Sequence, residues 1–433
     1  MFRNLKNTFY GWHVVAGAFV LAVFGWGMGF YGPPVWLGVV HATRGWPIAL
    51  ISTAVTLHFL VGAGIGAVVP NLYRRFGASR VTMTGSLCMA CGVAGWSLAS
   101  APWQLFVATV LTGLGWGTMS APAINALVSP WFARKRPAAL GMAYNGGSIG
   151  GVIFSPLWVA AVGLLGFAGS SVAIAAVMLL LVWTLAALLF TRTPQQLGLQ
   201  QDGDSASAIA ARKNSSITSL PGRALWHDRK FLTLAAGMAF GLFAQIGLVA
   251  HLFTLLTPAL GAQYAGFAMG FVTLLAIVGR TAMGYLMPPN ADRRLIACAG
   301  YVLQCAGSVA LLAAAGTSVP LLLTGIVLFG CGFGNATSLP PLIAQVEFAD
   351  EDVPRAVSLI VASAQAAYAF APATFGVIRD LLPATGLTTN GGIGVFVFAA
   401  IVQALAVATF FAGRSARRPA DVAYRVGTGF SPR

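Results

Sequence analysis

Long apolar stretches, separated by short stretches rich in Gly, Pro, Arg or Lys, make up most of the chain. Each stretch reaches the roughly 20 residues that a helix needs to cross a bilayer, and exceeds the roughly ten-residue strands of a membrane barrel. The pattern therefore predicts an all-α integral membrane protein with twelve transmembrane helices. These lie near residues 12–40, 48–70, 81–100, 103–130, 138–163, 167–190, 231–257, 263–287, 295–315, 319–346, 355–379 and 392–412.

A polar stretch rich in Ser, Gln and Asp separates the first six helices from the last six. Its composition is too weakly apolar to cross a membrane or to fold alone, so we expect a flexible linker. The predicted organisation is an N-terminal six-helix bundle at 1–190, a cytoplasmic linker at 191–230, a C-terminal six-helix bundle at 231–413 and a cytoplasmic tail at 414–433.

Three short motifs recur at nearly one spacing in the two halves. GLGWG at 113–117 returns as GCGFG at 330–334, and PNLYRR at 70–75 returns as PNADRR at 289–294. Pro137 likewise matches Pro354. Because the matches run in the same direction, we expect two pseudo-symmetric bundles related in parallel, an architecture typical of transporters.

Composition and charge agree with a membrane location. The 433 residues are 58% hydrophobic and 8% charged, against about 25% charged in soluble domains, which excludes a soluble enzyme as the primary interpretation. The net charge of +15 comes from Lys and Arg in alternate loops, with Arg44 and Arg379 as exceptions. Positive loops stay on the cytoplasmic side, so we expect both termini there, in a cell (inner or plasma) membrane. Topology accounts for the charge without nucleic acid, and contact with anionic lipids is a secondary role.

Metal, cofactor and enzyme chemistry find no support in the sequence. The five cysteines lie in apolar stretches, and Cys88 and Cys91 have no companion His or Cys to complete a zinc site. The glycine-rich runs lack the Lys and Ser/Thr of a phosphate-binding loop, so neither a cofactor nor an ATP-driven motor is expected. The apolar stretch that begins near the N-terminus reaches Val40, too long for a signal peptide, and should remain as the first helix.

Arg280 is the basic residue that lies well inside an apolar stretch. Such an arginine costs about 2.5–3.5 kcal/mol to insert and usually faces a polar cavity with a partner. None of the ten acidic residues lies in the middle of a helix, so we expect the partner to be an anionic ligand held by the guanidinium. The alternative is that Arg280 reaches toward the lipid headgroups.

Other polar residues inside the helices are candidates for coupling or for a cavity. His58 and His251 could carry protons, although a neutral histidine bonded between helices is the commoner arrangement. Uncharged polar residues could together line a central cavity, while each alone could serve as a link between helices. They are Tyr31, Asn125, Asn145, Gln245, Asn335, Gln365 and Tyr368. Prolines on these helices, including Pro33, Pro122, Pro340 and Pro372, would permit bending near the site.

The loop between the second and third helices resembles the conserved loop of the major facilitator superfamily, G-x-x-x-D-R-x-G-x-R-R. The resemblance implies a role in conformational change for Gly66, Asn71, Arg74, Arg75, Gly77 and Arg80. Arg74 stands where the family has Asp, a departure from the usual charge relay at this loop.

A second resemblance points to the monocarboxylate transporter family. WFARKRPAALGMAYNGGSIG at 131–150 is similar to that family's fifth-helix signature, and GRTAMGYL at 279–286 is similar to its eighth helix and to that of oxalate/formate antiporter relatives. There the eighth-helix arginine binds the substrate carboxylate, and Arg280 occupies that position. The matching fifth-helix residues are Trp131, Phe132, Arg134, Lys135, Arg136, Gly141, Ala143, Gly146 and Gly150.

Departures from this family narrow the expected substrate. Ala276 stands where proton-coupled relatives have Asp, the first helix has no Lys, and Gln365 stands where dicarboxylate-binding relatives have Lys. One fixed positive charge suits one carboxylate, so we expect a small monocarboxylate, hydroxylated or aromatic in view of Tyr31, Trp26 and Tyr368.

The sequence thus predicts a secondary active transporter that works by alternating access and functions as a monomer. Proton symport is what the resemblance implies, while the missing Asp leaves carboxylate exchange or facilitated diffusion open. Efflux of a drug or metabolite is an alternative, although a cation would require a buried carboxylate. A transporter-like sensor is a remoter alternative, because neither the linker nor the tail contains a recognisable output domain.

Overall fold

The computed structural model describes residues 9–132, 135–203, 224–288, 291–314, 317–348, 352–381 and 392–414. The expected linker and tail are thus described for 191–203, 224–230 and Arg414, and 204–223 and 415–433 lie outside the described residues. Secondary structure in the described ranges is helical throughout. The helices are α1 (Tyr10–Gly29), α2 (Gly32–Arg44), α3 (Ile48–Phe76), α4 (Ala78–Leu98), α5 (Pro102–Met119), α6 (Ala121–Val128), α7 (Arg136–Leu189), α9 (Arg229–Leu260), α10 (Ala262–Leu286), α11 (Arg293–Ala313), α12 (Val319–Phe333), α13 (Asn335–Glu347), α14 (Val353–Ala369), α15 (Ala371–Leu381) and α16 (Gly392–Ala412).

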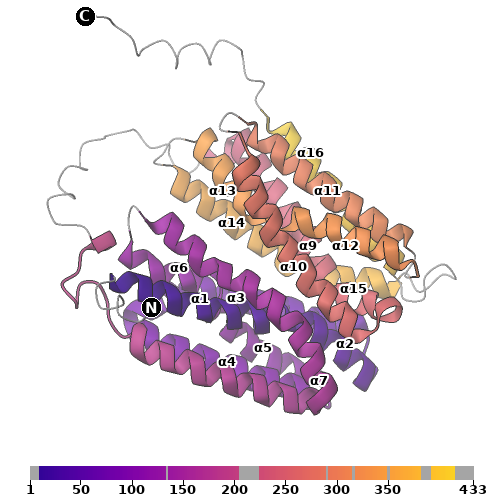
Figure 1. The fold of residues 1–433 in the computed structure, drawn as a ribbon, viewed down its shortest axis with the longest axis horizontal. Coiled ribbons are helices and arrows are strands. Elements are labelled where there is room, and N and C mark those ends of the chain that lie inside the picture. Colours follow the sequence, from indigo (N-terminus) through magenta and orange to yellow (C-terminus); the bar gives the residue numbers. More distant parts are fainter. Residues whose placement is uncertain are drawn as a thin grey trace, which may run out of the picture.

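The predicted membrane-spanning helices are present. Ten helical stretches in the described ranges are long and apolar enough to cross a bilayer. One of them, Ala138–Leu189, makes two passes, because α7 turns back at Gly166, a glycine with a φ of +69° (Figure 1). The pair α5 and α6, which is not among these ten, makes one further pass, which gives the twelve crossings expected from the hydrophobic pattern.

Four crossings that the sequence predicts as continuous helices are instead broken into two. The breaks lie between α1 and α2, α5 and α6, α12 and α13, and α14 and α15. Proline lacks the N–H that would continue the helical ladder, and Pro33, Pro122 and Pro372 each lie at the second position of the following helix. The break between α12 and α13, at Gly334, has no proline so close to it.

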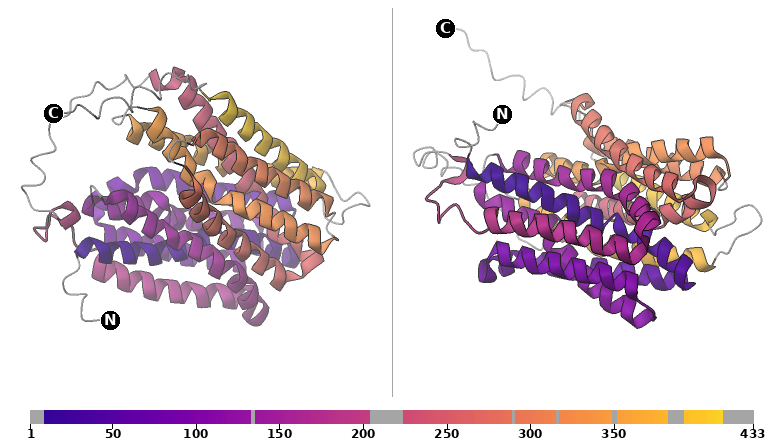
Figure 2. Two further views of the ribbon diagram at one scale, coloured as in Figure 1. Left: turned by 45° about the horizontal axis from the view of Figure 1, so that its top comes forward. Right: turned by 60° about the horizontal axis from the view of Figure 1, so that its bottom comes forward.

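The helices form two groups that lie side by side (Figures 1 and 2). Helices α1–α7 pack mainly on one another, as do α9–α16, and the two groups meet where α10 packs on α7 and α15 packs on α3. We call the end of the molecule that carries residues 190–203 and 224–228 the linker end. The end that carries α2 and the start of α3 is the opposite end, on the right of Figure 1.

Polar contacts join the two halves at the opposite end. Three hydrogen bonds run from the first turns of α3 to the second half. They link the Ala49 amide to Asp380 Oδ2 at 2.8 Å, Ser52 Oγ to His251 Nε2 at 3.5 Å, and the Ala373 amide to Thr56 Oγ1 at 3.0 Å. The halves are therefore fastened together at the end away from the linker.

Candidate functional site

His58 fills the gap that the break in the first crossing leaves. Pro33 cannot donate to the Gly29 carbonyl four residues before it, and His58 Nε2 lies 2.9 Å from that oxygen. The other ring nitrogen, Nδ1, lies 2.9 Å from Thr112 Oγ1 on α5. His58 is buried, so its observed arrangement is a link between α1, α3 and α5.

The break between α12 and α13 is bonded by two glutamines. Gln304 Nε2, on α11, donates to the Gly332 carbonyl at 3.1 Å. Gln245 Nε2, on α9, donates to Gln304 Oε1 at 2.8 Å and to the Phe333 carbonyl at 3.4 Å. Gln245 was a predicted cavity residue, whereas the sequence analysis did not identify Gln304, which lies singly in an apolar run.

Arg280 reaches the same break from α10. Its Nε donates to the carbonyl of Gly334, the residue between α12 and α13, at 3.1 Å. The side chain is partly buried, and no carboxylate among the described residues forms an ion pair with it. Within the described part of the chain, the hydrogen bond from Nε is the one that the guanidinium makes.

Close packing of backbone on backbone makes this contact possible. A Cβ at Gly334 would lie 2.0 Å from the Ala276 carbonyl oxygen, and a Cβ at Gly279 would lie 2.2 Å from the Cys331 carbonyl oxygen. Helices α10 and α12 thus approach each other through glycine on both sides. A larger residue at either position would separate them and carry Arg280 away from the break.

Gly334→Ala is expected to lower the stability of the protein by about 1–3 kcal/mol, because the added methyl group overpacks the contact with Ala276. Equilibrium unfolding in mixed micelles measures the change. The matched control is Gly300→Ala on α11, where a Cβ would meet no atom within 4 Å. There the substitution is expected to be neutral or stabilising by up to about 1 kcal/mol. Equal losses for the two variants would contradict the close-packing explanation.

Tyr31 is a residue of the first half that interacts with α10, the helix that carries Arg280. Its ring packs on Gly151 of α7, and its hydroxyl is within reach of the Thr273 hydroxyl on α10 and interacts electrostatically with Arg280. Tyr31 lies at the break between α1 and α2. Tyr31 of the first half and Gly334 of the second half therefore both interact with Arg280, the predicted anion-binding residue.

Four more of the predicted cavity residues are placed as follows. Gln365 and Tyr368 on α14 contact each other, and the Tyr368 ring lies 5.9 Å from that of Phe59 across the two halves. Asn335 is buried at the start of α13, and Asn145 is exposed on α7. The structure thus brings Tyr31, Gln245 and Asn335 to the two breaks.

His251 lies at the opposite end, between the halves. Its Nε2 is 3.1 Å from the Pro372 carbonyl and 3.5 Å from Ser52 Oγ, and its ring is fully buried. It meets α3 at Ser52, six residues before His58, which sits among α1, α3 and α5.

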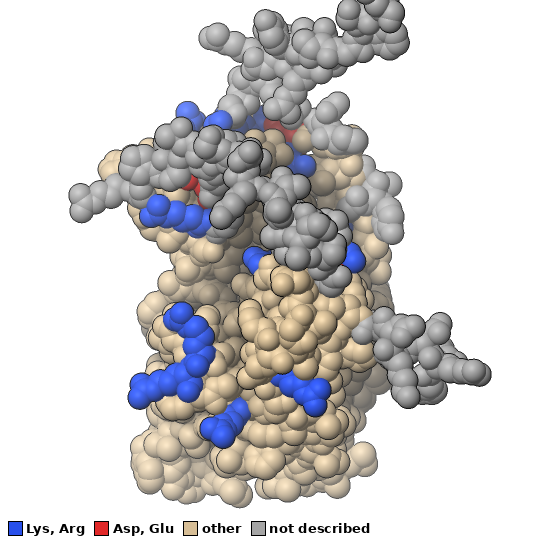
Figure 3. Space-filling view, turned by 90° about the vertical axis from the view of Figure 1, so that its left-hand side faces the viewer, with Lys and Arg blue, Asp and Glu red and all other residues tan. Residues whose placement is uncertain are grey.

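The predicted loop motif is exposed in the first half, except for the buried Gly66. Gly77, with a φ of +85°, joins α3 to α4, and Gly66 packs near Pro122. Arg74 bonds to the neighbouring Asn71, and Arg75 is exposed. Figure 3, which faces the linker end, shows Lys and Arg side chains spread over this surface.

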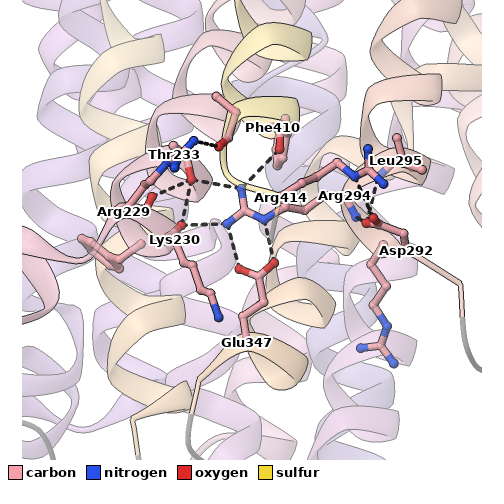
Figure 4. A network of polar contacts seen from close by, with 12 residues as sticks. Arg229, Lys230, Thr233, Asp292, Arg294, Leu295, Glu347, Phe410 and Arg414 are labelled. Atoms are coloured by element: carbon pink, nitrogen blue, oxygen red, sulfur yellow. Dashed lines mark hydrogen bonds and ion pairs between the residues drawn. The ribbon is translucent and has the colours of Figure 1, made fainter. Parts of the chain in front are cut away.

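The repeated loop in the second half is built differently. Arg294, which corresponds to Arg75, is 2% exposed and forms a two-pronged ion pair with Glu347 at the end of α13, at 2.6 and 2.8 Å (Figure 4). It also donates to the Lys230 carbonyl at 2.8 Å and to Thr233 Oγ1 at 3.0 Å, both on α9. Arg294 and Glu347 each lie one residue outside a helix predicted from the sequence, and their buried network was not predicted.

Asp292 stands beside this network at the start of α11. Its carboxylate accepts hydrogen bonds from the backbone amides of Arg294 and Leu295 and from Arg414 Nε at 2.8 Å. Burial raises the pKa of Asp292, but these hydrogen bonds outweigh it, so the pKa lies below its usual value. No group of three His, Cys, Asp or Glu side chains that could hold a metal occurs within the described residues.

Comparison with known proteins gives a family match over most of the chain. Residues 15–372 match the description of the Major Facilitator Superfamily. "MFS-type transporter 1" of Ophiocordyceps sp. is 25% identical over 350 residues, which cover 78% of this chain and 72% of that protein. "Multidrug resistance protein MdtH" of Yersinia enterocolitica is 40% identical over 84 residues, a stretch of 19% of this chain and 21% of that protein.

A solved structure shows the same fold. The crystal structure of a D-xylose-proton symporter matches with a TM-score of 0.70 at 13% identity, and covers 93% of this chain and 98% of that one. At this identity the likeness concerns the arrangement of the helices.

Proposed function

Because the chain belongs to the Major Facilitator Superfamily and is therefore a transporter, we propose that its substrate is a small organic anion, most simply a monocarboxylate. The observation that carries this proposal is the position of Arg280. Its guanidinium donates one hydrogen bond to the Gly334 carbonyl, at the break between α12 and α13, and interacts electrostatically with Tyr31 of the first half. A partly buried cation at membrane depth without a carboxylate partner among the described residues is suited to an anionic ligand.

Alternating access fits the distribution of contacts between the halves. The hydrogen bonds that join them lie at the opposite end, so the halves can separate at the linker end to admit a ligand. We assign the linker end to the cytoplasm, because Lys and Arg gather there. The monomer contains both halves of the site and is the functional unit in this proposal.

Coupling to protons is part of the proposal, with exchange of carboxylates as the alternative. His58 and His251 are the titratable side chains named for it. His58 bonds to the carbonyl freed by the break beside Tyr31, so a change in its protonation would act on that break. Exchange needs no titratable group, which agrees with the absence of an acidic residue at Ala276.

Uptake of a labelled small monocarboxylate by the purified protein in proteoliposomes tests the proposal. We expect saturable uptake, competition by other monocarboxylates and little competition by dicarboxylates, because one guanidinium satisfies one carboxylate. An inward proton gradient should drive accumulation if the protein is a symporter, and preloaded carboxylate should stimulate uptake if it is an exchanger. Empty liposomes are the control.

Drug efflux is the second candidate, favoured by the similarity of 84 residues to a multidrug resistance protein. Drug efflux predicts that the same proteoliposomes transport lipophilic cations. Flux of such cations, with no flux of any carboxylate, would overturn the proposed substrate class and leave the family assignment intact.

A further inference from the structure

Three consecutive backbone carbonyls at the break between α12 and α13 are each bonded by a side chain from a different helix. Gln304 of α11 bonds to Gly332, Gln245 of α9 bonds to Phe333, and Arg280 of α10 bonds to Gly334. The break is therefore held from three sides, and one of the three side chains is the proposed anion-binding residue.

The physical reason lies in the solvent around a membrane helix. The last carbonyls of a helix have no partner within that helix, and hydrocarbon offers no water to satisfy them. Gln245 and Gln304 are each 1% exposed, so they supply hydrogen bonds that water would supply elsewhere. Gln304 gives its amide nitrogen to Gly332, and its oxygen therefore faces Gln245, which fixes both amides in one orientation.

We propose that Gln304, together with Gln245, is a positioning residue for Arg280. The two amides fix the end of α12, the fixed end presents the Gly334 carbonyl to Arg280 Nε, and this bond directs the terminal nitrogens of the guanidinium to the substrate. This inference rests on the proposed function of Arg280. In this proposal Gln245 helps to fix the break and does not itself bind the substrate, which Arg280 holds.

The first test is Gln304→Leu, which removes both hydrogen bonds of the amide at similar volume. We expect the KM for the carboxylate to rise about tenfold, the equivalent of one lost hydrogen bond, with the maximal rate within about twofold. The matched control is Gln403→Leu, because Gln403 is also buried in the second half but bonds to Ser308 at 2.9 Å, away from the break. Its KM should stay within about twofold of the unmodified protein.

A double-mutant cycle separates positioning from general loosening of the structure. Arg280→Lys keeps a charge but has no Nε donor for Gly334, so the link from Gln304 to the charge is already broken in that variant. We expect Gln304→Leu to add less than about twofold to the KM of Arg280→Lys. If the KM of the double variant rises by the product of the two single fold-changes, the inference is overturned. An unchanged KM in Gln304→Leu alone would also overturn it.

Two further measurements keep the test decisive. If Gln304→Leu cannot be purified as a folded protein, Gln245→Met takes its place in the cycle, because it removes the bonds to Gln304 and Phe333. If the unmodified protein moves no carboxylate, the proposed function fails. Amide hydrogen exchange at residues 332–338 then tests whether Gln304 fixes the break. Faster exchange in Gln304→Leu than in Gln403→Leu would support a fixed break, and equal exchange would overturn it.

Discussion

Replacing Arg294 by leucine is expected to lower the free energy of unfolding by about 3–5 kcal/mol, the range measured when one partner of a buried ion pair is removed. The substitution leaves Glu347, which is 15% exposed, without its cation, and removes the hydrogen bonds that Arg294 donates to the Lys230 carbonyl and the Thr233 hydroxyl. Equilibrium unfolding of the purified protein in mixed micelles measures the loss.

A second ion pair a few residues away provides the control. Arg414 and Asp292 are also 2.8 Å apart, but their side chains are 34% and 32% exposed, and exposed pairs contribute about 0–1 kcal/mol (Figure 4). Arg414→Leu should therefore cost far less than Arg294→Leu. A loss below about 1 kcal/mol for Arg294→Leu would show that burial of its ion pair does not govern stability here.

Substitution of Arg280 is expected to have the largest effect on transport. A hydrogen bond to a charged group contributes about 1.5–3 kcal/mol, which corresponds to about 10- to 150-fold in affinity. Arg280→Lys keeps the charge but loses the paired nitrogens of the guanidinium, so its loss of affinity should lie near the lower end of this range. The loss for Arg280→Gln should lie near the upper end. The concentration dependence of uptake in proteoliposomes measures both variants.

Arg355→Lys is the control for Arg280, because Arg355 is exposed near the start of α14. Its uptake should equal that of the unmodified protein. Unchanged affinity of Arg280→Gln for every transported carboxylate would remove Arg280 from the binding site and favour its interpretation as a residue that reaches toward the headgroups.

The helices could be predicted because hydrophobic length alone identifies a membrane crossing. Their breaks were harder to place. Pro33, Pro122 and Pro372 mark three of them, since each removes a backbone donor, whereas Gly334 is one of many glycines in the sequence. A glycine that lets two backbones meet has the same local sequence as one that merely packs loosely, so the contact between α10 and α12 required the structure.

The charged residue of the candidate site could be predicted from the sequence, whereas the contacts between its uncharged side chains could not. Arg280 stands out because a cation inside an apolar run is costly. Gln304 does not, because its role depends on Gln245, 59 residues earlier in the chain. Arg75 and Arg294 look alike in their repeated loops, and the carboxylate that distinguishes them, Glu347, comes from another helix.

The difference between Arg75 and Arg294 has a consequence for how easily each half deforms during transport. At the position that corresponds to Glu347 the first half has Pro130, so its exposed Arg75 has no equivalent acid. In the second half, Arg294 ties α9, α11, α13 and α16 together, so their linker-end turns should open only as one cooperative unit. We therefore expect the second half to be the stiffer one at the linker end, and deformation during transport to fall mainly on the N-terminal half.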